Sequence, residues 1–144
     1  MQTVADILKA KGDEVWTISP EITVFDALTI MADKNIGALV VVEGEDIVGM
    51  MSERDYARKV ILHGKSSRQI PVRDIMTTDI QFVRPDQSIE DCMDQMTNKR
   101  VRHLPVMDND HLVGIISIGD VVKAIIDDRE STIQHLKNYI TGGR

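Results

Sequence analysis

One nine-residue pattern occurs twice in the sequence, as IVGMMSERD at residues 47–55 and as LVGIISIGD at residues 112–120. In each copy an apolar run that contains a glycine leads to a serine, and an aspartate follows three residues later. The same offset of 65 residues maps Pro20 onto Pro85 upstream without a gap. Self-similarity over this length predicts one structural unit that is duplicated in tandem.

The first copy shows the order of elements inside the unit. A short extended segment at residues 15–18 precedes a predicted helix, whose apolar residues recur at helical spacing behind the capping pair Thr23 and Asp26. Two apolar runs at residues 38–42 and 47–51, separated by a turn-rich stretch, are typical of paired strands. A second helix is predicted to begin near Glu53. The order is therefore β-α-β-β-α.

The second copy repeats this order 65 residues later, with an extended segment at residues 80–83 and a final helix beginning near Ile118. We therefore expect an α+β fold in which two small mixed sheets pack with pseudo-two-fold symmetry. The expected domains are residues 1–64, residues 65–128 and a C-terminal helical extension over 129–144, with a linker at residues 63–67. The extension is expected to pack on the module or on another subunit.

Bulk composition limits the function. The chain has 144 residues and a net charge of −6, so its overall field repels nucleic acid and anionic lipid. Its single cysteine, Cys92, has no partner for a disulfide or a metal site, and the histidines show no metal-ligand spacing. No signal peptide or membrane span is recognisable, so we expect a cytoplasmic protein without metal.

The repeated motifs carry a family resemblance. Besides the two nine-residue patterns, the chain contains VRDIMT at residues 72–77 and RVRHLPV at residues 100–106. Together they resemble a tandem pair of cystathionine-beta-synthase (CBS) domains, or Bateman module, of the stand-alone bacterial type, over nearly the whole chain. The resemblance implies a regulatory module that binds an adenosine-containing ligand in clefts between the paired domains. It also implies a homodimer.

The Ser-x-x-Asp pairs, Ser52/Asp55 and Ser117/Asp120, are open to two interpretations. A serine followed three residues later by an acid is a helix-capping pattern with no site implied. Alternatively, each carboxylate can accept hydrogen bonds from the hydroxyls of a ribose, while the serine and the helix start face a phosphate or sugar. The resemblance favours ribose binding for both aspartates.

Positive charge is unequal between the copies. Arg102 and His103 in the second copy correspond to Gly37 and Ala38 in the first, whereas Arg54 in the first corresponds to Gly119 in the second. Without a ligand, these would be ordinary surface or strand residues. The resemblance places them near a nucleotide phosphate, and the two sites are expected to differ.

The resemblance also implies residues around the adenine and the sugar. The predicted nucleotide-binding set is Thr17, Ile18, Ala38, Leu39, Ser52, Arg54, Asp55, Thr78, Ile80, Arg102, His103, Leu104, Pro105, Ser117, Ile118 and Asp120. AMP or NAD is favoured as ligand, with ADP, ATP and S-adenosylmethionine as further candidates. No catalytic motif is present, so we expect no enzyme activity. The alternative function is a purely structural dimerisation module.

Overall fold

The computed structural model describes residues 2–12 and 14–140 of the chain. The chain divides into two compact units, and one of them is discontinuous in sequence. The central unit comprises residues 15–80, and the terminal unit combines residues 1–14 with residues 81–144. The predicted α+β class with two repeated units is confirmed.

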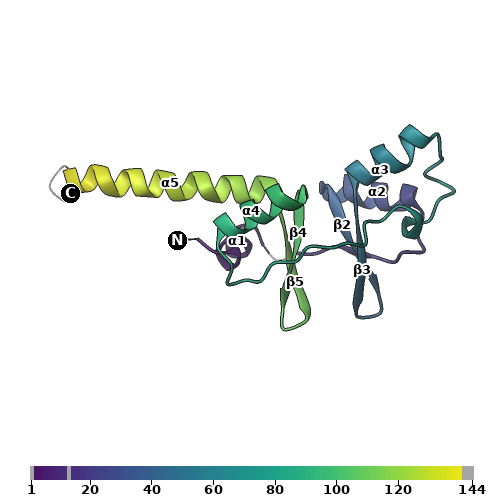
Figure 1. Cartoon of the computed structure of the whole chain (residues 1–144), viewed down its shortest axis with the longest axis horizontal. Coiled ribbons are helices and arrows are strands. Elements are labelled where there is room, and N and C mark those ends of the chain that lie inside the picture. The colour runs from purple at the N-terminus through teal and green to yellow at the C-terminus, as the bar shows by residue number, and fades with distance from the viewer. Residues whose placement is uncertain (1, 13, 141–144) are drawn as a thin grey trace. The chain divides into compact units, whose positions relative to one another are not determined.

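The central unit holds a three-stranded sheet and its helices (Figure 1). Strand β1 pairs in parallel with β2, and β2 pairs antiparallel with β3, which confirms the predicted hairpin. Short 3-10 helices at Ile61–His63 and Val72–Asp74 complete the unit. The main elements are β1 (Thr17–Ile18), α2 (Val24–Lys34), β2 (Ala38–Glu43), β3 (Asp46–Ser52) and α3 (Glu53–Lys59).

The predicted linker at residues 63–67 does not join the two units, because it lies inside the central unit. Backbone hydrogen bonds hold the end of this segment and the chain after it against the start of α2: Phe25 N–H donates to Ser67 O and Val24 N–H donates to Ile70 O, both at 2.9 Å. The chain therefore passes from one compact unit to the other between residues 14 and 15 and again between residues 80 and 81, instead of between residues 64 and 65. The predicted boundaries separate the two copies of the repeat in the sequence. Of the predicted extension over residues 129–144, residues 141–144 lie outside the described residues.

The terminal unit is built on an antiparallel hairpin, β4 (His103–Asp108) with β5 (His111–Ser117). Three helices pack with it: α1 (Val4–Lys11), α4 (Ile89–Lys99) and α5 (Ile118–Ile140). The last helix runs on through the expected extension as far as Ile140, and Figure 1 shows its second half continuing beyond α1 and α4.

Among the described residues of the terminal unit, no strand corresponds to β1. The extended segment predicted at residues 80–83 makes only an isolated bridge, in which Val83 N–H donates to Pro105 O and Met107 N–H donates to Val83 O. In the central unit, Val40 N–H donates to Trp16 O, and Pro105 stands at the position of Val40. Proline has no N–H to donate, so the corresponding ladder bond cannot form.

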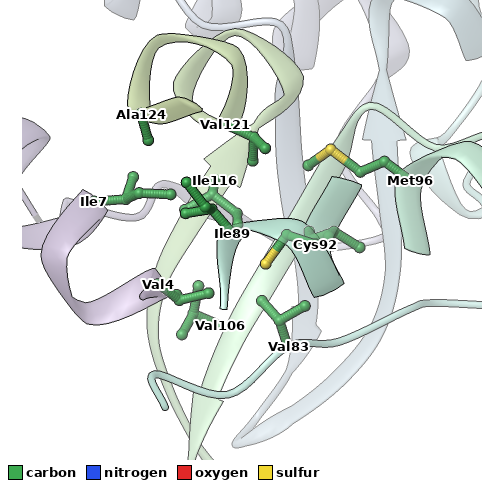
Figure 2. Packing of buried hydrophobic residues seen from close by; sticks show 11 residues of the cluster. Val4, Ile7, Val83, Ile89, Cys92, Met96, Val106, Ile116, Val121 and Ala124 are labelled. Atoms are coloured by element: carbon green, nitrogen blue, oxygen red, sulfur yellow. The ribbon is translucent and has the colours of Figure 1, made fainter. Parts of the chain in front are cut away.

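The core of the terminal unit explains why the N-terminal helix belongs to it. Val4 and Ile7 of α1 pack with Ile89 and Cys92 of α4 and with Ile116 of β5 (Figure 2). Each of these side chains is at most 5% exposed. Burying them against the hairpin stabilises the unit by the hydrophobic effect. A chain segment that is first in sequence therefore completes the core of the last repeat.

The capping signals act as predicted. The Thr23 side chain accepts a hydrogen bond from Asp26 N–H at the start of α2, and Ser88 accepts one from Asp91 N–H at the start of α4. Within the part of the chain that the structure describes, no helix is both long and apolar enough to cross a membrane.

Candidate ligand site

Both Ser-x-x-Asp pairs form reciprocal capping boxes at the start of a helix. At α3, Ser52 N–H donates to Asp55 Oδ2 over 2.9 Å, and Asp55 N–H donates to Ser52 Oγ over 3.2 Å. At α5, Ser117 N–H donates to Asp120 Oδ2 over 2.8 Å, and Asp120 N–H donates to Ser117 Oγ over 3.2 Å. The capping interpretation is therefore confirmed, and any ligand must use what these carboxylates have left to offer.

Asp55 has little acceptor capacity left. Its Oδ2 accepts from both the backbone N–H and the hydroxyl of Ser52, while its Oδ1 accepts from Thr77 Oγ1 at 3.1 Å and faces Lys59 Nζ at 3.2 Å. A carboxylate offers about four lone-pair sites, two on each oxygen. Three of these sites accept hydrogen bonds, the Lys59 ammonium forms an ion pair with Oδ1, and the side chain is only 13% exposed.

Asp120 is less fully engaged. Its Oδ2 accepts from Ser117 N–H and from Lys11 Nζ at 2.7 Å, and Lys11 Nζ also donates to Ile115 O at 2.9 Å. Among the hydrogen bonds of the described residues, none involves Asp120 Oδ1. Burial raises the pKa of Asp120, but the hydrogen bonds from Lys11 and Ser117 outweigh this and leave the pKa below its ordinary value.

Strand pairing brings Arg102 and His103 beside the start of helix α5, where Asp120 lies. His103 stands opposite Ser117 in the β4–β5 hairpin, and Ile118 N–H donates to Arg102 O at 2.8 Å. Burial lowers the pKa of His103, the Asp120 carboxylate opposes this, and the charges of Lys11 and Arg102 lower the pKa further. The result is a neutral imidazole near pH 7, beside two cations and one carboxylate.

The central unit has the same backbone but different side chains. Ala38 stands opposite Ser52, and Glu53 N–H donates to Gly37 O at 3.1 Å. Since glycine and alanine replace Arg102 and His103, this strand start carries no charge. The two copies thus carry different charge at equivalent backbone positions, and Arg54 lies on the first turn of α3.

Several residues predicted to line an adenine slot are packed in the cores. Ile18 and Leu39 belong to the core of the central unit and Leu104 to that of the terminal unit, and Ala38 and Pro105 are also buried. Thr17 and Thr78 are exposed and Ile80 is half-buried, all in the central unit. At the buried positions, the side chains pack in the cores, so only backbone groups could bind the edge of an adenine ring.

A hollow of about 560 Å³ lies beside the start of α5 in the terminal unit. Of the predicted residues, Arg102 and Ile118 line it. Its apolar surface comes mainly from isoleucine and valine side chains, and the full lining is Arg102, Ile118, Gly119, Val122, Lys123 and Ile126.

Sequence reasoning did not identify three partners of the aspartates: Lys11, Lys59 and Thr77. Lys59 follows Asp55 by four residues on one helix, a spacing at which opposite charges meet, so the sequence held a signal for it. Thr77 and Lys11 reach their aspartates through tertiary packing across 22 and 109 residues. No local pattern indicates those two contacts.

Comparison with known proteins was consistent across sequence and structure. The family model of the CBS domain matches twice, at residues 4–62 and 72–127. A mitochondrial CBS domain-containing protein of Arabidopsis thaliana is 40% identical over 98% of this chain and 73% of its own length. A CBS domain-containing protein of Bacillus subtilis is 35% identical over 84% of each chain.

Solved structures show the same fold. A protein of Burkholderia ambifaria described as a signal-transduction protein with CBS domains has a TM-score of 0.85 and 52% identity, over 88% of this chain and 96% of that one. A CBS domain pair solved with 5′-methylthioadenosine and S-adenosyl-L-methionine has a TM-score of 0.76 over 86% of this chain and 99% of its own. At 24% identity, that likeness extends to the fold alone.

Proposed function

The chain belongs to the CBS-domain family, and we propose that it is a non-catalytic regulatory module that binds an adenine nucleotide at Asp120 in the terminal unit. The observation that carries the proposal is the half-engaged carboxylate of Asp120, gathered with Arg102, His103 and Lys11 by the β4–β5 hairpin and helix α1. This grouping supplies both the acceptor that a ribose needs and the cations that a phosphate needs.

The ribose contact rests on acceptor capacity. Asp120 Oδ2 is held by Ser117 and Lys11, so the carboxylate is fixed in place while Oδ1 still has lone pairs for the two hydroxyls of a ribose. A preorganised acceptor loses little entropy when a ligand binds. Asp55 must release Thr77 or Lys59 to do the same. We therefore assign the principal site to Asp120 and a weaker site to Asp55.

The phosphate contact rests on local charge. The chain as a whole is acidic, but Lys11 contacts Asp120, the charges of Lys11 and Arg102 both lower the pKa of His103, and the neutral His103 can donate one hydrogen bond. These groups favour a phosphorylated adenosine over S-adenosylmethionine, whose own charge is positive at sulfur. AMP or NAD is the proposed ligand, with ADP and ATP as further candidates. The CBS pair solved with S-adenosyl-L-methionine keeps that ligand among the candidates, on the evidence of the fold alone.

One observation favours the alternative, a structural module with no ligand. Both aspartates complete capping boxes, and a capping box needs no ligand to explain its acid. Under that alternative, Asp120→Asn changes stability by about 1 kcal/mol, and nucleotides have no effect on either protein.

A thermal-unfolding panel separates the two functions. The full chain is unfolded with AMP, ADP, ATP, NAD or S-adenosylmethionine, and so are its Asp120→Asn and Asp55→Asn variants. A ligand at a hundred times its dissociation constant stabilises the fold by about 2.7 kcal/mol. We expect AMP or NAD to stabilise the parent chain by this amount. The stabilisation should be lost in Asp120→Asn and largely kept in Asp55→Asn.

Asp6→Asn is the matched control, because the Asp6 carboxylate accepts from Thr3 N–H in a capping box at the start of α1, as Asp120 does from Ser117 N–H at α5. It should keep the full nucleotide-induced gain. Equal gains in Asp120→Asn and Asp6→Asn would remove Asp120 from the site, and no gain with any nucleotide in the parent chain would leave the structural module as the function.

A further inference from the structure

Helix α5 exposes a row of apolar side chains that nothing in the terminal unit covers. Five of them have between 41% and 81% of their surface exposed: Val122, Ile126, Ile133, Leu136 and Ile140. Soluble proteins rarely leave a contiguous apolar stripe of this length in water, and such stripes mark interaction surfaces. The stripe therefore calls for a partner outside the described unit.

The spacing of the stripe identifies the kind of partner. Its positions are 122, 126, 129, 133, 136 and 140, which alternate by four and three residues, the 3.5-residue period of a coiled-coil seam. Only position 129 departs from apolar character, since it is an arginine. A single polar seam residue is typical of coiled coils, where it helps to fix register at some cost in stability. The stripe fits another helix.

The hollow beside the start of α5 indicates which helix. Gly119, Val122, Lys123 and Ile126 line it, and a Cβ added at Gly119 would meet only Ser117 Oγ, at 3.6 Å. The first half of α5 thus offers a hollow, whereas its second half offers projecting Ile133 and Leu136. These two surfaces complement each other if two α5 helices run antiparallel.

We propose that α5 pairs antiparallel with α5 of a second copy of this chain, so that Ile133 and Leu136 of each copy fill the hollow of the other. The contact is isologous and closes a two-fold dimer. In this register Val122 lies opposite Ile133 of the second copy, and Gly119 lies opposite Leu136. Residues 119–136 overlap, about 27 Å of helix at 1.5 Å per residue.

Charge beside the seam favours this register. It places Lys123 next to Glu130 of the second copy, and by symmetry Glu130 next to the second copy's Lys123. A shift by one heptad toward the C-terminus instead brings Lys123 next to Lys137 and Glu130 next to its own equivalent. Like charges flanking a helix pair are unfavourable. The flanking charges thus oppose that neighbouring register.

The first test measures the mass of the full chain in solution by light scattering and sedimentation. We expect a dimer for the parent chain and a monomer for Leu136→Glu, because a carboxylate cannot be buried in the seam without a partner. His135→Glu is the matched control: it adds the same charge at a neighbouring exposed position off the seam and should stay dimeric. Circular dichroism checks that each variant is folded.

The second test addresses orientation and register. Lys123→Glu and Glu130→Lys should each weaken the dimer about three- to tenfold, because each creates two like-charge contacts. The double variant should recover most of the affinity of the parent chain. A Val122→Cys/Ile133→Cys chain should cross-link as a dimer on oxidation, whereas each single-cysteine chain should not, since Cys92 is buried.

Three results would overturn the proposal. A monomeric parent chain removes the dimer, and a dimer that persists in Leu136→Glu places the contact elsewhere. A dimer that Leu136→Glu disrupts, but that shows neither charge-reversal recovery nor cross-linking in the double-cysteine chain, excludes the antiparallel register. Arg102 and Ile118 line the same hollow, so these measurements are made without nucleotide; a failure of the dimer is then distinguishable from a failure of the thermal-unfolding panel.

Discussion

Lys11 Nζ lies 2.7 Å from Asp120 Oδ2, although the two residues are 109 positions apart in the chain. The contact exists because α1 packs against β5 and α5 instead of the strands that follow it in sequence. Lys11 also donates to Ile115 O, so one ammonium group ties the first helix to the end of the last strand and the start of the last helix. The candidate site of the terminal unit is thus completed by the end of helix α1.

Replacement of Lys11 by methionine should destabilise the protein by about 1 kcal/mol. The variant keeps the aliphatic stem but loses an ion pair whose partners are 33% and 23% exposed, together with the hydrogen bond to Ile115 O. Urea unfolding followed by circular dichroism measures the change. Lys9→Met, at an exposed position of the same helical turn, is the control and should stay within about 0.5 kcal/mol of the parent.

Stability should also rise with pH through the range in which His103 titrates. Burial holds the pKa of His103 in the folded protein below the ordinary value of 6.5, so the unfolded chain binds the proton more readily. The stabilisation is complete above pH 6.5 and is lost as the pH falls toward the folded-state pKa. The slope from this one group is at most about 1.4 kcal/mol per pH unit.

His103→Asn tests the origin of this slope. Unfolding free energies of both proteins, measured at intervals between pH 7.5 and 5, should diverge in slope as the parent loses stability faster below about pH 6.5. Parallel curves would assign the acid sensitivity to other groups. Asp120 and the cations Lys11 and Arg102 are kept in both proteins, so their contribution cancels to first order.

The features that depend on local pattern could be predicted from the sequence. The packing of helix α1 with the second copy of the repeat could not. Capping pairs, the hairpins and the helix beginning at Ile118 follow from spacing, and the structure contains them. The lost ladder bond at Pro105 could also have been read from the sequence, since proline lacks the donor that Val40 supplies. The contact of Lys11 with Asp120 could not, because nothing local shows that α1 joins the last repeat.

The thiol of Cys92 should be unreactive in the folded protein. Burial raises its pKa to about 11, and the nearby Asp91 and Glu90 contribute to the rise, so thiolate is scarce at neutral pH. The side chain is also fully buried in the core of the terminal unit. Labelling by a chromogenic disulfide should therefore be slower than in the urea-unfolded chain by at least about a hundredfold. Fast labelling without denaturant would show that α4 opens independently of the core.

Two equivalent glycines should respond differently to alanine. At Gly49 an added Cβ would lie 2.7 Å from Met76 Sδ and 3.0 Å from the carbonyl oxygen of Thr77, which is fixed by hydrogen bonds between Met50 and Thr77. At Gly114 it would meet the end of the Leu8 side chain, at 2.6 Å from Cδ2. A side chain can rotate away, whereas a hydrogen-bonded carbonyl cannot move without loss of the bridge.

We expect Gly49→Ala to cost about 2–3 kcal/mol of unfolding free energy and Gly114→Ala about 1 kcal/mol. Truncation of the neighbour separates the two mechanisms. Leu8→Ala combined with Gly114→Ala should lose less than the sum of the single variants, by about 1 kcal/mol, while Met76→Ala should recover only part of the cost of Gly49→Ala. Strict additivity of Leu8→Ala and Gly114→Ala would mean that the close approach of α1 to β5 does not limit this position.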